Sequence, residues 1–378
     1  MIPSTETDDL RVQEMTMLET PQALRETLPA SITARETVTR TRDAIRRILS
    51  KQDSRLLVVV GPCSIHDTDA ALDYAARLQS VAARFADQML IVMRTYFEKP
   101  RTTVGWRGLI NDPHLDGSFD MRAGLQKARA LMAKINDLGL PVATEMLDPI
   151  TPQYFSDLVS FAAIGARTTE SQTHRALASG VSMPVGFKNG TDGGLQIAID
   201  ALVSAGSPHS FLGVGADGVC RVVKTTGNPD TVLILRGGKT GGPNYDEKSV
   251  AEAARELRAR SDASPSLIVD CSHANSGYDP DRQADAWRSV VRQRANGNHA
   301  LVGLMVESHL FGGKQSLGTD PTRLRYGVSV TDGCLGWDTT LDLLEEAHQT
   351  LSAGDDAPRG DAVLRNGNER GAACLSAA

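Results

Sequence analysis

Short runs of consecutive apolar residues recur along the chain, and a segment with helical spacing follows each of them. None of the runs alternates apolar with polar residues, as a strand with one solvent-exposed face would. Uninterrupted apolar character is typical of a parallel strand that is buried on both faces. After the first run, for example, Leu72, Ala75 and Leu78 fall on one face of a predicted helix. The eight runs cover residues 56–60, 90–93, 141–146, 161–166, 184–187, 231–235, 266–270 and 300–306.

Eight strand–helix units in succession predict an α/β fold of the (β/α)8 type, a TIM barrel. An open doubly wound sheet is the alternative, and eight regular units argue against it. One connection is different, because residues 211–228 carry β-rich arms around an Ala-Asp-Gly turn and so predict an inserted β-hairpin. A barrel does not require such an insertion, so we expect it to serve assembly or regulation.

The two ends of the chain differ from the middle. Residues 34–53 have the pattern of an amphipathic helix that leads into the first strand. The last segment is rich in Ala, Gly and charged residues and has little to bury, which is typical of disorder. We therefore expect an N-terminal arm over residues 1–50, a barrel over residues 51–352 and a disordered tail over residues 353–378.

Every predicted strand ends in an ionisable or metal-ligating side chain. The active sites of TIM barrels lie at the C-terminal ends of the strands, so these side chains are expected to meet at one rim. Any one of them alone would more often be a core or surface residue, whereas eight of eight indicate a functional site. In chain order they are Cys63, Arg94, Glu145, Arg167, Lys188, Arg236, His273 and Glu307.

Four of the rim residues are cationic, although the formal net charge of the chain is −6. Their mutual repulsion would be costly unless an anion with several charges binds among them. Arginine suits this task because its guanidinium grips phosphate or carboxylate with two hydrogen bonds. The four are Arg94, Arg167, Lys188 and Arg236.

The segment that follows the second strand adds a second cationic cluster beside the first, together with a hydroxyl group. Two anionic sites indicate two phosphorylated substrates, or one bisphosphate. The residues of the second cluster are Lys99, Arg101, Thr102 and Arg107.

The remaining chemistry at the rim is that of a divalent metal site. Cys63, His273 and Glu307 offer a thiolate, an imidazole and a carboxylate, and Asp332 after the eighth strand offers a further carboxylate. Such mixed ligands fit Mn, Fe, Co or Zn without selecting one of them. Because these residues are far apart in the sequence, the hypothesis depends on the barrel to bring them together. A lysine at a strand end, such as Lys188, could instead form a Schiff base, but its cationic neighbours favour phosphate binding.

Seven segments of the chain closely resemble the class I 3-deoxy-D-arabino-heptulosonate-7-phosphate (DAHP) synthases. Within that family the chain is most similar to the tyrosine-sensitive isoforms of the feedback-regulated branch, over about residues 8–350. KPRT in the second segment resembles this family more than the related octulosonate-phosphate synthases. The segments are GPCSIHD (61–67), MRTYFEKPRTTVGWRGLINDP (93–113), GARTTESQ (165–172), GFKNGTDG (186–193), ILRGGK (234–239), DCSHANS (270–276) and MVESHL (305–310).

The resemblance implies metal-dependent condensation of phosphoenolpyruvate with erythrose 4-phosphate, the first step of the shikimate pathway. The four rim cations would hold phosphoenolpyruvate, with Lys99 and Arg107 near its carboxylate and Glu145 nearby. Arg101 and Thr102 would hold the phosphate of the sugar. The four residues with metal-ligating side chains match the metal ligands of the family.

The resemblance also implies feedback inhibition by an aromatic amino acid and assembly into a homotetramer or homodimer, in which the arm reaches a neighbouring subunit. Tyrosine is the favoured effector because Pro149 and Gly213 match the tyrosine-responsive isoforms, whereas a serine at 213 would match the phenylalanine-responsive ones. The positions that match the effector site are Asp8, Asp9, Val12, Pro149, Pro152, Gln153, Leu177, Val181, Ser182, Phe211, Gly213 and Val223.

Four features depart from the family or go beyond it. The loop 236–245 reads RGGKTGGPNY, two residues longer than the family pattern, and Arg107 stands where many relatives have lysine. Cys334 follows Asp332 closely enough that an oxidative link to Cys63 is conceivable, although a simple buried thiol is the better interpretation. The segment after residue 353 has no predicted role.

Composition narrows the class of protein further. An acidic chain is not expected to bind nucleic acid, no apolar run approaches the length of a membrane span, and no secretory signal opens the sequence. The five cysteines do not form a disulfide framework, so we expect a cytoplasmic protein. Two other functions stay open: a catalytically silent barrel that senses an aromatic amino acid, and a Schiff-base aldolase that uses Lys188.

Overall fold

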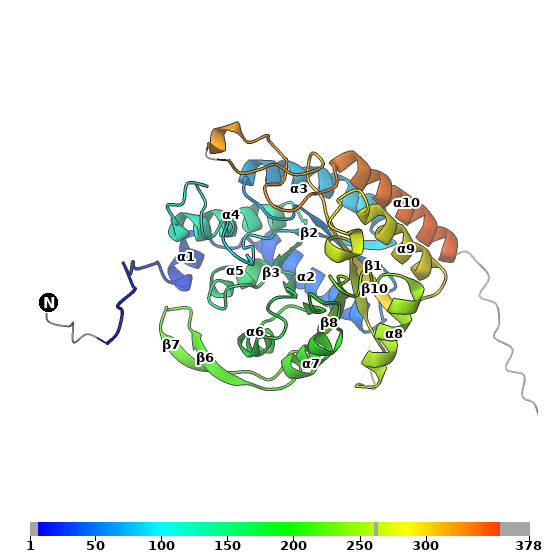
Figure 1. Ribbon diagram of the computed structural model, residues 1–378, viewed down its shortest axis with the longest axis horizontal. Coiled ribbons are helices and arrows are strands. Elements are labelled where there is room, and N and C mark those ends of the chain that lie inside the picture. The colour runs from blue at the N-terminus through cyan, green and yellow to red at the C-terminus, as the bar shows by residue number, and fades with distance from the viewer. Residues whose placement is uncertain (1–6, 261–263, 319, 356–378) are drawn as a thin grey trace, which may run out of the picture.

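The centre of the molecule is a closed barrel of eight parallel strands (Figure 1). The computed structural model describes residues 7–260, 264–318 and 320–355. The first strand pairs on one side with the second and on the other with the last, which closes the barrel and confirms the predicted fold. The barrel strands are β1 (Leu56–Gly61), β2 (Met89–Arg94), β3 (Val142–Glu145), β4 (Phe161–Ile164), β5 (Val185–Lys188), β8 (Thr231–Leu235), β9 (Leu267–Asp270) and β10 (Leu301–Glu307).

Helices surround this barrel, and several begin at an N-cap that their sequence supplies. The side chains of Ser31, Asp67, Asp120 and Asp246 each accept a hydrogen bond from a backbone N–H in the first turn of the helix that follows. The helices are α1 (Pro21–Thr27), α2 (Ile32–Leu49), α3 (Thr68–Ala82), α4 (Met121–Asp137), α5 (Pro152–Phe155), α6 (Gln172–Ala178), α7 (Gln196–Ala205), α8 (Glu247–Arg258), α9 (Gln283–Ala295) and α10 (Trp337–Asp355), with 3-10 turns η1 (Ala83–Phe85), η2 (Ser156–Leu158), η3 (His273–Ser276) and η4 (Pro321–Arg323).

The inside of the barrel is packed with side chains, which explains why its strands lack polar alternation. Leu57, Val59 and Met305 belong to this inner cluster. Ile45 and Ile48 of α2 join the same cluster, so α2 covers one end of the barrel. Because these residues contact the interior where the strands begin, the opposite end carries the C-terminal ends of the strands and the predicted rim.

The arm contains one helix that the sequence pattern did not predict. Helix α1 has Thr20 as its N-cap and proline at its first position, which are typical of a helix start. The helix has only seven residues, too few to show a clear helical pattern of apolar positions. The longer arm helix, α2, begins at Ile32 and ends at Leu49, close to the predicted range. At the other end of the chain α10 extends to Asp355, three residues into the segment expected to be disordered, and the rest of that segment lies outside the described residues.

The predicted hairpin consists of β6 (Ser210–Val214) and β7 (Cys220–Lys224), which pair antiparallel outside the barrel (Figure 1). Its outer face is apolar and exposed, with Leu212 at 83% and Val222 at 65% exposure. Near its tip, the Ala216 carbonyl accepts a hydrogen bond from the Gln22 N–H, so the hairpin contacts the arm at the start of α1. No helix in the described part of the chain is both long enough and apolar enough to cross a membrane.

Candidate active site and metal centre

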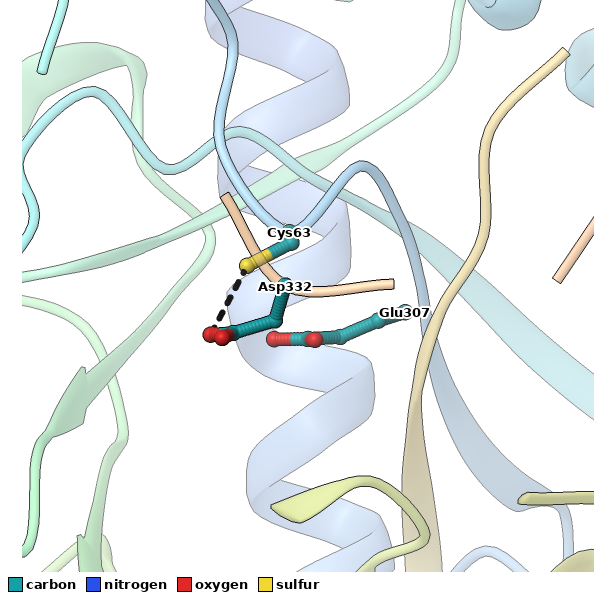
Figure 2. Close-up of side chains that lie close together, drawn as sticks. All are labelled: Cys63, Glu307 and Asp332. Atoms are coloured by element: carbon teal, nitrogen blue, oxygen red, sulfur yellow. Dashed lines mark hydrogen bonds between the residues drawn. The ribbon is translucent and has the colours of Figure 1, made fainter. Parts of the chain in front are cut away.

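Three of the four predicted metal ligands lie together at the C-terminal end of the barrel (Figure 2). Ligand atoms of Cys63, Glu307 and Asp332 all lie within 4.8 Å of one another. Cys63 follows β1, Glu307 ends β10, and Asp332 comes from the loop that precedes α10. Because β1 and β10 are paired neighbours, their ends bring the thiol and the carboxylate together even though they are far apart in sequence.

The thiol of Cys63 is fully buried between hydrogen-bond donors and carboxylates. Lys99 Nζ and Thr331 Oγ1 each lie 3.1 Å from its Sγ, and its thiol donates to Asp332 Oδ2 at 3.4 Å. Burial, with the negative charge of Glu307, raises the pKa of the Cys63 thiol to about 11. A bound cation would therefore be needed to hold this group as a thiolate at neutral pH.

The fourth predicted ligand, His273, is not part of this compact group. Its Nδ1 lies 2.9 Å from Asp270 Oδ2 and 2.7 Å from Ser272 Oγ, while Nε2 makes no hydrogen bond to any described residue. Histidine ligands usually contact a carboxylate in this way through the ring nitrogen that does not bind the metal. His273 also has a φ of 60°, a strained conformation for this residue type and one that is concentrated at functional sites.

Asp270 organises this side of the mouth and is not among the residues predicted from the sequence. Its Oδ2 accepts a hydrogen bond from Lys188 Nζ at 2.6 Å and also contacts His273. Although burial opposes ionisation, the charges of Lys188 and His273 hold the pKa of Asp270 well below its usual range. Asp270 is the last residue of its apolar run, so its position at the rim is predictable from the sequence, whereas its pairing with Lys188 is not.

Arg94 is a buried cation, and one of its guanidinium nitrogens has no hydrogen-bond partner among the described residues. Its Nε and one NH2 group donate to backbone carbonyls, and NH2 also pairs with Glu307 at 2.9 Å. The guanidinium carbon stacks over Tyr96, 3.5 Å from the ring centroid. The other terminal nitrogen, NH1, is buried without a hydrogen-bond partner in the described chain, a costly state that a bound anion would relieve. Gly61 is required here because a Cβ would come within 2.8 Å of the Arg94 carbonyl.

The other predicted substrate residues vary in burial. Arg236 is buried and its NH2 donates to the Tyr278 hydroxyl at 3.3 Å. Arg167 is exposed and donates to the Pro100 carbonyl at 3.4 Å, which connects the end of β4 to the second cationic cluster. Within that cluster Lys99 is buried and Arg101, Thr102 and Arg107 are exposed, whereas Glu145 is buried at the end of β3.

The sequence and the fold both match known proteins. Residues 29–345 match the DAHP synthetase I family. The chain belongs to this family. It is 51% identical over 345 residues to the Tyr-sensitive phospho-2-dehydro-3-deoxyheptonate aldolase of Escherichia coli (strain K12), covering 91% of this chain and 96% of the relative. It is 53% identical over 346 residues to the Phe-sensitive phospho-2-dehydro-3-deoxyheptonate aldolase of the same strain, covering 92% of this chain and 98% of the relative.

A solved structure agrees with this assignment. The phospho-2-dehydro-3-deoxyheptonate aldolase from Francisella tularensis SCHU S4 has a TM-score of 0.88 and 42% identity to this chain, covering 91% of this chain and 99% of that one. The enzyme class and the family expected from the sequence are therefore confirmed.

The loop 236–245, which is expected to exceed the family pattern by two residues, folds back on itself. The Gly238 and Gly242 backbones exchange two hydrogen bonds of 2.9 Å, which closes a turn around residues 239–241. The turn contacts the segment after β5, because the Lys239 N–H donates to the Thr191 carbonyl at 2.9 Å. The loop thus contacts the segment that follows Lys188 at the end of β5.

A separate cavity of about 350 Å³ lies between the hairpin, α5 and α6. None of its described lining residues is charged. Asp8, Asp9 and Val12, in the exposed segment before α1, do not line it. The other nine positions expected to form the effector site all line it: Pro149, Pro152, Gln153, Leu177, Val181, Ser182, Phe211, Gly213 and Val223.

The cysteines considered for an oxidative link lie close together as free thiols. The Cys63 N–H donates to Cys334 Sγ at 3.4 Å. Cys334 is fully buried, and burial raises the pKa of its thiol well above the usual range. The simpler interpretation, a buried thiol, accounts for these observations.

Proposed function

We propose that this chain condenses phosphoenolpyruvate with erythrose 4-phosphate and water to give DAHP and inorganic phosphate. This would be the first step of the shikimate pathway, which leads to chorismate and the aromatic amino acids. The observation that carries the proposal is the adjacency of two features: the Cys63, Glu307 and Asp332 cluster, and the open, buried donor on Arg94. Family membership supports the same reaction.

The buried cations would bind phosphoenolpyruvate. Arg94 is fixed by its carbonyl bonds and by Glu307, so its free N–H group needs no rearrangement to meet an anion. Arg236 and Lys188 lie at the ends of β8 and β5, which are paired neighbours in the barrel. Cations placed in advance lower the repulsion between two anionic substrates and hold them close enough to react.

The exposed part of the second cationic cluster would bind the sugar phosphate. Arg101 uses its Nε to hold the Trp106 carbonyl at 2.8 Å, which leaves its two terminal nitrogens available to a phosphate. Thr102 is its neighbour and adds a hydroxyl donor. Arg107 is exposed within the same segment, where it can contribute charge at the edge of the mouth.

The ligand types at the mouth fit a divalent metal. Sulfur, imidazole and carboxylate donors are present, and the contact between Asp270 and His273 leaves Nε2 of the imidazole open. Cys63, His273, Glu307 and Asp332 would hold the ion. When bound, it would supply Lewis-acid stabilisation at the aldehyde oxygen of erythrose 4-phosphate. Mn, Fe, Co and Zn all suit these donors.

A Schiff-base aldolase that uses Lys188 is the less favoured reaction. Such chemistry requires an amine that is free to attack a carbonyl, and Lys188 Nζ is held in a buried ion pair with Asp270 at 2.6 Å. Borohydride reduction in the presence of either substrate is expected to leave the protein unlabelled. Covalent labelling at Lys188 would support the aldolase instead.

One assay tests the main proposal. We expect phosphate release only when both substrates are present, loss of activity with EDTA, and recovery when one of the four metals is returned. Full activity in the metal-stripped protein would contradict the metal-dependent reaction. No phosphate release under any condition would instead favour the catalytically silent sensor.

We further propose that tyrosine inhibits the enzyme from the cavity beside the hairpin. The volume of about 350 Å³ accommodates an aromatic amino acid, and the apolar walls suit a ring. The charged ends of the effector find no opposite charge in this lining. Asp8 and Asp9 of a neighbouring subunit would supply the missing carboxylates, which fits a homodimer or homotetramer. Inhibition by Tyr, Phe and Trp measured side by side tests the choice, and a response to Phe alone would contradict it.

A further inference from the structure

A second group of arginines lies away from the barrel mouth, where the arm packs against the barrel. Here a cavity of about 530 Å³ is bounded by α1, α2, α4 and η2, and we call it the arginine cavity. Its described lining contains four arginines but a single carboxylate, that of Asp157. The four are Arg25, Arg35, Arg42 and Arg129.

The one carboxylate is already engaged. Asp157 accepts two hydrogen bonds from Arg129, at 2.8 and 3.0 Å, and its Oδ1 lies 3.7 Å from Arg25 Nε. Arg35 and Arg42 make no ion pair with a carboxylate of the described lining, in which four guanidinium groups lie beside one carboxylate and three positive charges remain in excess. Such an excess is unfavourable in a partly buried cavity and is removed by a bound anion.

Arg42 is held in position without being neutralised. Its Nε and NH2 donate to the carbonyls of Val159 and Ser156 at 2.6 to 2.9 Å, whereas NH1 makes no hydrogen bond to a described residue. Burial and the charge of Arg46 lower the pKa of Arg42 to about 10. The carbonyl bonds hold the Arg42 guanidinium in place, so its NH1 group can donate hydrogen bonds to an anion without rearrangement.

The other polar residues that line the arginine cavity carry hydroxyl groups, which can donate hydrogen bonds. Thr39, Ser156 and Ser182 contribute hydroxyl groups beside the arginines. This excess of positive charge favours an anion with more than one negative charge, and guanidinium and hydroxyl donors together suit the tetrahedral oxygens of phosphate. We propose that the arginine cavity binds a phosphate group, carried by inorganic phosphate or by a small phosphate monoester.

This site is distinct from the substrate sites at the mouth. Its residues belong to the arm helices and to the outer helices of the barrel, so an anion bound there joins the arm to η2. Ser156 and Ser182 also line the cavity beside the hairpin, so the two cavities share part of a wall. Phosphate binding would therefore stabilise the packing of the arm next to the proposed effector site.

The test uses the full chain and compares two arginines of α2. Arg35 lines the cavity and donates only to the nearby Ala30 carbonyl, so its loss should not affect folding. Arg40 is exposed on the same helix and does not line the cavity, which makes Arg40→Gln the matched control. The unfolding temperature is measured against phosphate concentration, with chloride holding the ionic strength constant, and again with glycerol 3-phosphate.

We expect Arg35→Gln to weaken the stabilising effect of phosphate about fivefold and Arg40→Gln to leave it unchanged. Phosphate bound at the mouth contributes equally in all three proteins. Stabilisation by glycerol 3-phosphate at lower concentration than by inorganic phosphate would identify a monoester as the ligand, and the reverse order would identify inorganic phosphate. The same phosphate response in both variants and the unaltered protein would overturn the proposal.

Selenate, a tetrahedral dianion with an anomalous X-ray signal, locates the site directly. In crystals of the full chain soaked in selenate we expect an anomalous peak within hydrogen-bonding distance of Arg42. A cavity without a peak would refute the assignment, whatever the enzyme assay shows. Because neither measurement requires turnover, the outcome is independent of the proposed reaction.

Discussion

The barrel mouth and the cavity beside the hairpin differ in the charge of the residues that line them. At the mouth, buried cations and carboxylates contact one another, as in the pairs of Arg94 with Glu307 and Lys188 with Asp270. The cavity beside the hairpin has no charged lining residue in the described structure, although an amino acid carries two charges. The mouth is thus assembled within one chain, whereas under the proposed effector role the cavity would need charged groups from another subunit.

The mouth and the hairpin cavity therefore depend on different features of the fold. Buried charges at the mouth need rigid strand ends that keep donors and acceptors in register, because an unpaired buried charge is costly. The hairpin, whose outer apolar face is exposed, can present a wall that a second subunit covers. Reaction chemistry is therefore expected to depend on single residues of one chain, and regulation on assembly.

Removal of a metal ligand from the mouth should have the largest effect. We expect Cys63→Ala to lower kcat by at least about 10³-fold, because loss of a metal site removes several kcal/mol of transition-state stabilisation. Cys220→Ala, at an exposed thiol of the hairpin, is the control and should keep normal turnover. Phosphate release measures both. Comparable activity in the two variants would show that the thiol at the mouth is dispensable.

Glu98 joins the two regions, since it precedes Lys99 and accepts a hydrogen bond of 3.0 Å from Thr151, beside the effector positions. Burial, with the nearby charge of Asp148, raises the pKa of Glu98 to about 7. The folded state thus binds this proton more tightly than the unfolded state. The stabilisation it provides is complete below about pH 4 and is lost as the pH rises to about 7.

Glu98→Gln keeps the shape of the side chain and removes this titration. At pH 8 we expect the variant to be more stable than the unaltered protein by on the order of 3 kcal/mol, with the difference vanishing near pH 4. Denaturant unfolding at several pH values provides the measurement. Glu36→Gln, at an exposed position of α2, should follow the unaltered protein, and a parallel pH profile for Glu98→Gln would refute the assignment.

Asp270→Asn tests whether the carboxylate positions His273 for the metal. Loss of such a supporting carboxylate typically weakens metal binding about 10- to 100-fold. Competition with a chelator measures the affinity, and the unfolding temperature shows whether the unpaired Lys188 has destabilised the fold. Asp230→Asn removes a partly exposed ion pair with Arg46 and serves as the control. Unaltered metal affinity in a folded Asp270→Asn protein would exclude the positioning role.

The smallest effect is expected in the cavity beside the hairpin. A Cβ at Gly213 would approach Val223 Cγ2 to 2.8 Å, so Gly213→Ser narrows the cavity and adds a hydroxyl group. We expect about fivefold weaker inhibition by tyrosine relative to phenylalanine, the size of one perturbed polar contact. Val222→Ser, on the exposed face of the same hairpin, should leave the ratio unchanged. The ratio of inhibitory concentrations decides between these outcomes.

Much of the barrel was predictable because its strands are buried on both faces and so lack polar residues. The hairpin was predictable from its Ala-Asp-Gly turn. The role of Asp270 was not, because its pairing with Lys188 joins β9 to β5 across the mouth, and β8 lies between them. The unpaired N–H donor of Arg94 was not predictable either. The other donors of this side chain bond to backbone carbonyls, which every residue type carries, so the sequence does not indicate which donors are already used.

Helix α2 covers the far end of the barrel with Ile45 and Ile48, so ligands are expected to approach the rim from the C-terminal ends of the strands. Arg94, Lys188 and Arg236 are buried, whereas Arg101 and Thr102 are exposed, so a ligand of the buried cations is expected to bind before a ligand of the exposed pair. Under the proposed roles, phosphoenolpyruvate loads first and the sugar phosphate follows. The order of substrate addition would then be a property of the architecture rather than of any affinity.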